Sequence, residues 1–110
     1  LKGNWDGIYF NRDANDMLSL IATWQACDLA NNRLYNGDEN AAYAAIKARA
    51  IILPGRTDLY FPVADNAAEV AMMPNAEVRV IDSIWGHYAG GGRVAEDTAV
   101  IDAALKDLLA

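Results

Sequence analysis

Residues 50–62 read AIILPGRTDLYFP, and they carry the clearest indication of the fold class. Its first part, residues 50–53, is a short, continuous apolar run that Pro54-Gly55 ends. A run of this kind is typical of a strand buried on both faces, as in a parallel sheet covered by helices. A second strand is expected over residues 76–81, where valines alternate with charged residues.

Apolar residues at helical spacing predict helices on either side of these strands. The expected helices span about residues 15–30, 39–47, 62–73 and 96–109. Asp13 or Asn15 suits the N-cap of the first helix, and Asp38 suits that of the second. Residues 1–11 are expected to form an irregular connection. Cys27 falls within the apolar pattern of the first helix and is expected to be a small core residue.

The order of elements defines the fold class. From residue 38 onward the order is helix, strand, helix, strand, helix, which predicts an α/β fold with a parallel sheet and crossover connections. Two strands do not make a stable open sheet, and they leave exposed edges. The sequence therefore predicts the last part of a larger doubly wound fold with an incomplete sheet. Either the remainder of a longer chain or a homodimer would complete that sheet.

Composition narrows the function classes. The 110 residues carry 9 Lys and Arg against 15 Asp and Glu, a net charge of −6. Nucleic acid and anionic membranes repel such a surface, so neither is an expected partner. No apolar run approaches the roughly 18 residues of a membrane span. A single cysteine, and no leader after Leu1, fit a cytoplasmic protein whose start was processed or lies further upstream.

Two residues stand where α/β sheets place their functional groups. Asp58 follows the first predicted strand, and His87, the one histidine, lies in the loop after the second. Such loops lie side by side at the carboxyl ends of parallel strands. A carboxylate beside an imidazole forms the acid and base of a nucleophilic triad. The alternative interpretation is a loop histidine and a turn aspartate with no shared chemistry.

Other kinds of site find less support. One histidine with scattered carboxylates has no metal-ligand spacing, so no metal is expected. Gly90-Gly91-Gly92 lacks the lysine and the strand–glycine–helix order of a phosphate loop. The serines, Ser19 and Ser83, are not flanked by glycines, so neither fits a nucleophile elbow.

Several segments carry a resemblance to a known family. Residues 46–53 read IKARAIIL, residues 55–62 read GRTDLYFP, and residues 83–87 read SIWGH. They resemble the acid-bearing strand, the acid loop and the histidine motif of the α/β-hydrolase superfamily, in particular of its homoserine O-acetyltransferase family. Residues 13–15 and the helix after them resemble the segment that returns the chain from that family's helical lid.

The resemblance implies a Ser-His-Asp acyltransferase or ester hydrolase with Asp58 as the triad acid and His87 as the base. It assigns residues 1–37 to the end of the helical lid and the return helix. Residues 38–110 become the C-terminal strands and helices of the α/β-hydrolase core. The family's nucleophilic serine lies upstream of this segment, so the 110 residues alone are expected to be inactive.

The resemblance leaves the substrate open. A small-molecule acyl ester or thioester is implied, with no cofactor, and acetyl-CoA as acyl donor only for a transferase. Homoserine acetyltransferases commonly have an acidic residue after the histidine, whereas Tyr88-Ala89-Gly90 stands here, so a hydrolase of another ester fits as well. A function of a different class is a non-catalytic binding module that completes its sheet by oligomerising.

Overall fold

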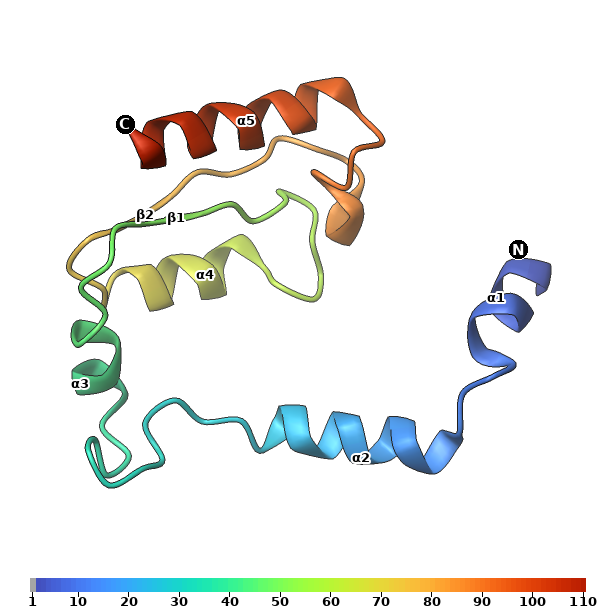
Figure 1. Cartoon of the computed structure of the whole chain (residues 1–110), viewed down its shortest axis with the longest axis horizontal. Helices are drawn as coiled ribbons and strands as arrows, with labels where there is room; N and C mark the ends of the chain where they lie inside the picture. The colour runs from blue at the N-terminus through green and yellow to red at the C-terminus, as the bar shows by residue number, and fades with distance from the viewer. Residues whose placement is uncertain (1) are drawn as a thin grey trace.

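The computed structural model describes residues 2–110 and shows a two-stranded parallel sheet between two helices (Figure 1). β1 (Ala50–Ile52) pairs with β2 (Ala76–Val78) in parallel, with Ala50 opposite Ala76. α4 (Val63–Val70) connects the strands and packs on β2, and α5 (Ala95–Leu109) packs on β1. The two helices lie on opposite sides of the sheet in Figure 1. The predicted α/β class and parallel pairing are confirmed.

The pairing continues past the strands toward the loops that follow them. Gly55 forms an isolated parallel bridge with Ile81. The N–H of Ile81 donates to the carbonyl of Pro54, and the N–H of Arg56 donates to the carbonyl of Ile81, each at 2.9 Å. Ile81 is 2% exposed and is among the few buried apolar residues. This ladder fixes how the two loops leave the sheet.

Two helices begin where capping residues predict. Asp13 precedes α2 (Ala14–Gln25), and its carboxylate accepts the N–H of Asn15 at 2.7 Å. Asp38 precedes α3 (Glu39–Ala44) and accepts the N–H of Ala41 at 3.0 Å. A side-chain oxygen at this position satisfies backbone N–H groups that have no partner within the helix.

The predicted helix ends were too far along the chain. α2 ends at Gln25 and not near Ala30, because the carboxylate of Asp28 accepts the N–H of Ala30 at 2.7 Å and turns the chain. α3 and α4 end about three residues early as well, at Ala44 and Val70. The second strand ends at Val78, and only the bridge at Ile81 continues it.

Three expectations were wrong in kind. The structure has a helix, α1 (Lys2–Tyr9), where an irregular connection was expected; Gly3 and Gly7 obscured its pattern. Cys27 is exposed and is not a core residue, because it lies beyond the end of α2, which itself contains no buried residue. β1 is half-buried along its length and is not buried on both faces.

The described chain is extended for its length. Its radius of gyration is 17.2 Å, whereas a compact domain of this size has one of about 13 Å. Its accessible surface is 8427 Å², against about 6,000 Å² for a compact monomer of this mass. Both values agree with an incomplete sheet, whose outer edges have no neighbouring strand within residues 2–110.

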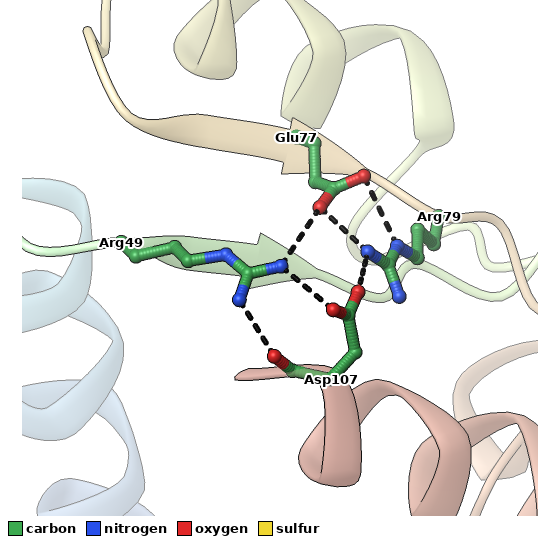
Figure 2. Close-up of polar contacts among 4 residues, drawn as sticks. All are labelled: Arg49, Glu77, Arg79 and Asp107. Atoms are coloured by element: carbon green, nitrogen blue, oxygen red, sulfur yellow. Dashed lines mark hydrogen bonds and ion pairs between the residues drawn. The ribbon is translucent and has the colours of Figure 1, made fainter. Parts of the chain in front are cut away.

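An ion-pair network links α5 to Glu77 of β2 and to Arg49 and Arg79, which flank β1 and β2 (Figure 2). Arg49 contacts Asp107 of α5 at 3.0 Å, and Arg79 contacts Glu77 at 2.6 Å and also Asp107. The hydrogen bonds from Arg79 and Arg49 lower the pKa of Asp107, and that from Arg79 lowers the pKa of Glu77. The network holds the last turn of α5 in place.

Within residues 2–110 the structure contains no helix that is both long and apolar enough to cross a membrane.

Candidate functional site

The structure brings the two predicted site residues together. Nδ1 of His87 lies 3.1 Å from Oδ2 of Asp58, although 29 residues separate them in the chain. His87 sits in η1 (Gly86–Tyr88), a short 3-10 helix after β2, and Asp58 lies in the loop after β1. Parallel pairing of the strands places both loops at the same edge of the sheet, as the topology predicts.

The loop itself holds the Asp58 carboxylate. Oδ1 accepts the backbone N–H of Tyr60 at 2.8 Å and that of Phe61 at 3.3 Å, which leaves Oδ2 for the imidazole. The side chain of Asp58 is only 8% exposed, whereas that of His87 is 49% exposed. Burial raises the pKa of the Asp58 carboxyl, but hydrogen bonds from Tyr60 and His87 outweigh it and hold the pKa below its ordinary value.

This geometry sets the tautomer of the imidazole. Because an ionised carboxylate only accepts hydrogen bonds, Nδ1 of His87 carries the proton that Asp58 accepts. Nε2 is then the basic nitrogen of the ring. Such an imidazole can take a proton at Nε2 while the carboxylate stabilises the imidazolium.

A cleft of about 600 Å³ borders His87. Its lining residues are aromatic or aliphatic apart from the histidine: Ile8, Tyr9, Trp24, Tyr60, Phe61, His87 and Tyr88. The rings of Tyr60 and Phe61 lie 4.9 and 5.5 Å from the imidazole, centroid to centroid. The cleft therefore places apolar surface around the imidazole of His87. Such a lining suits a small uncharged molecule better than a charged one.

The N-terminal helices contribute to this cleft from far away in sequence. Trp24 of α2 lies 6.1 Å from the ring of Phe61, and Ile8 and Tyr9 come from α1. Sequence reasoning missed this wall, because no local pattern links a helix at residue 24 to a loop at residue 61. The aromatic pair next to Asp58, Tyr60-Phe61, was the one available signal.

The other expected groups lie as follows. Within the part of the chain that the structure describes, no three His, Cys, Asp or Glu side chains cluster as metal ligands would. Ser83 is 4% exposed, and its hydroxyl accepts the N–H of Trp85 at 3.2 Å. Ser19 is exposed on α2. Neither serine hydrogen-bonds to His87, so neither is placed to lose a proton to it.

The sheet, its flanking helices and the loops after the strands form part of an α/β-hydrolase fold, and the solved structures that match are esterases. An acetylester hydrolase from Corynebacterium glutamicum superposes with a TM-score of 0.80 at 36% identity, covering 94% of this chain and 29% of that one. The acetyl esterase MekB superposes with a TM-score of 0.77 at 36% identity, covering 89% of this chain and 28% of that one.

Curated relatives agree with the structures. A probable esterase of Corynebacterium glutamicum is 38% identical over 104 residues, which are 94% of this chain and 29% of that protein. An ethyl acetate hydrolase of Pseudomonas veronii is 35% identical over 97 residues, 88% of this chain and 27% of that protein. No family model matches the chain. The chain thus spans less than a third of the length of these relatives.

Proposed function

We propose that this chain carries the acid and the base of a hydrolase that cleaves short-chain carboxylic esters. The observation that carries the proposal is the contact of 3.1 Å between Nδ1 of His87 and Oδ2 of Asp58 beside an aromatic cleft. The relatives support it, since one is named a probable esterase and another an ethyl acetate hydrolase.

In the proposed mechanism His87 is the general base and Asp58 keeps it oriented. Nε2 takes the proton of a serine hydroxyl as its oxygen attacks the ester carbonyl carbon, and then gives that proton to the departing alkoxide. Water repeats the sequence on the acyl-serine and releases the acid. The serine and the donors that stabilise the oxyanion belong, in this proposal, to the additional length that the relatives have and these 110 residues do not.

The cleft favours an uncharged ester that needs no cofactor. None of the described residues that line it carries a carboxylate, an ammonium or a guanidinium group. An amino acid such as homoserine carries two charges. Burying them against this wall would cost desolvation energy that no charged partner there offsets. Hydrolysis of a neutral ester therefore fits better than acetyl transfer to homoserine, and acetyl-CoA has no assigned role.

The proposal extends to the organisation of the chain. Residues 1–37 would be the end of the helical lid and the return helix, and residues 38–110 the final strands and helices of the core.

The test is ester hydrolysis by the full native chain carrying Asp58→Asn. An amide cannot take the negative charge, so imidazolium formation is no longer stabilised, and kcat for p-nitrophenyl acetate should fall by roughly 10³–10⁴-fold. Asp102→Asn, an exposed aspartate on α5, is the matched control and should keep wild-type turnover.

Turnover by Asp58→Asn within tenfold of wild type would reject the role given to Asp58. If the wild-type chain hydrolyses no ester and reacts with no serine-directed probe, the non-catalytic module that oligomerises becomes the better account.

A further inference from the structure

One hydroxyl group joins the two loops that carry Asp58 and His87. Oγ1 of Thr57 donates to the carbonyl of Ser83 at 3.0 Å and accepts the N–H of Gly86, also at 3.0 Å. Thr57 directly precedes Asp58, and Gly86 directly precedes His87. The hydroxyl thus uses both its donor and its acceptor capacity between the neighbours of the pair.

The sheet ladder ends just before this point. Its last backbone bond between the two segments runs from the N–H of Arg56 to the carbonyl of Ile81. Beyond it, no backbone–backbone hydrogen bond within the described chain joins residues 57–61 to residues 82–90. Side chains make the remaining hydrogen bonds between the described loops. Besides the Asp58–His87 contact and the exposed pair of Arg56 with Asp82, these hydrogen bonds are the two made by Thr57.

The backbones of the two loops lie close enough together for the hydrogen bonds of Thr57 to set their alignment. A Cβ atom on Gly55 would lie 2.9 Å from the carbonyl oxygen of Gly86. A Cβ atom on Gly86, whose φ is +54°, would lie 3.2 Å from the carbonyl oxygen of Thr57. Because both loops have glycine at their closest approach, no side chain keeps them apart, and directional hydrogen bonds decide how they meet.

We propose that Thr57 is a positioning residue, whose hydroxyl aligns the two loops so that the Asp58 carboxylate meets Nδ1 of His87. The effect of Thr57 on turnover rests on the proposed function, whereas its effect on the contact between Asp58 and His87 does not. A displacement of about 1 Å in a catalytic arrangement costs on the order of 10²-fold in rate. Loss of the hydroxyl should therefore reduce kcat more than it weakens substrate binding.

The test compares Thr57→Val with Thr57→Ser in the full native chain. Valine keeps the branched shape and removes both hydrogen bonds, and kcat for p-nitrophenyl acetate should fall by roughly 10–10²-fold with KM within about twofold. Serine keeps the hydroxyl and should restore most of kcat. Thr98→Val is the matched control: it removes a part-buried hydroxyl that donates to the carbonyl of Val94, the residue before α5, and kcat should not change.

A Thr57→Val protein that is folded and keeps kcat within twofold of wild type would overturn the proposal, as would Thr57→Ser behaving like Thr57→Val. Should the valine variant not fold, Thr57→Ala removes the same hydroxyl without placing a methyl group against the N–H of Gly86, and the same limits apply.

A second measurement separates this proposal from the proposed function. The pKa of the Asp58 carboxyl, followed by ¹³C NMR, should rise toward its ordinary value in Thr57→Val, because the hydrogen bond from His87 that lowers it is lost. Thr57→Ser should leave that pKa unchanged. If the wild-type chain hydrolyses no ester, the proposed function fails and this pKa still tests Thr57; an unchanged pKa in Thr57→Val would overturn the positioning role.

Discussion

The two parts of the molecule have similar apolar patterns and different packing. α2 presents Leu18, Leu20 and Trp24 at helical spacing, yet these side chains are 65%, 67% and 59% exposed. α5 has the same kind of pattern but packs on β1, and its Ala104 is 3% exposed. An apolar stripe predicts that a helix packs against another surface. Whether that surface is present depends on the rest of the fold.

The two parts also contribute different elements to the site. The α/β unit holds the Asp58–His87 pair through its strands and loops, whereas the N-terminal helices contribute one wall of the cleft through Trp24 and its neighbours. Truncation of buried apolar side chains in the α/β unit should therefore lower folding stability, whereas substitutions on α2 at the cleft should change substrate use.

The largest effect in this comparison is expected for Ile81→Ala. The residue is 2% exposed at the bridge between the two loops, and truncating such a side chain costs about 2–5 kcal/mol of unfolding free energy. Val80→Ala, at a neighbouring position that is 41% exposed, should cost clearly less. Denaturant unfolding of the two variants measures the difference, and equal losses would contradict the placement of the core.

An intermediate effect is expected for Trp24→Ala. Removing this ring opens the wall beside Phe61, so kcat/KM for a short acetyl ester should fall by about tenfold, the equivalent of roughly 1.4 kcal/mol. The exposed Phe10, which lies outside the cleft, supplies the control in Phe10→Ala. If both variants keep the wild-type kcat/KM, the N-terminal helices do not form part of the site.

The smallest effect is expected at the ion-pair network of Figure 2. Folding lowers the pKa of Asp107 and of Glu77, so their contribution to stability is present above the ordinary carboxyl pKa of about 4 and is lost as pH falls through the lowered values. Thermal unfolding should therefore show a modest fall in Tm below about pH 4, and Asp107→Asn should reduce that dependence.

Asp102→Asn on the same helix is the control and should leave the acid dependence as it is in the wild type. If the Tm of Asp107→Asn has the same pH dependence as that of the wild type, the ion-pair network does not contribute to stability.

The sequence predicted the features that depend on nearby residues. The caps at Asp13 and Asp38, both strands and the parallel pairing follow from side-chain type and spacing, and the pairing in turn brought Asp58 and His87 to one edge. Exposure of Cys27 could not be predicted, because a periodic pattern does not show whether a second surface packs on it.

The parts of the site that sequence reasoning missed come from three-dimensional contacts. No sequence pattern singles out Thr57, because its two bonds to residues 83 and 86 exist only once the loops meet. Trp24 reaches Phe61 across an extended connection that no spacing rule describes. Both contacts join segments more than 25 residues apart, as their numbers show.

Whether His87 activates a serine nucleophile can be measured as the rate of covalent labelling by a fluorophosphonate, followed by intact mass spectrometry. The full native chain should gain the mass of one probe, and His87→Ala should do so at least about 10²-fold more slowly, because no base then removes the serine proton. Equal labelling rates in the two proteins would contradict the account and would leave the Asp58–His87 contact with a structural role only.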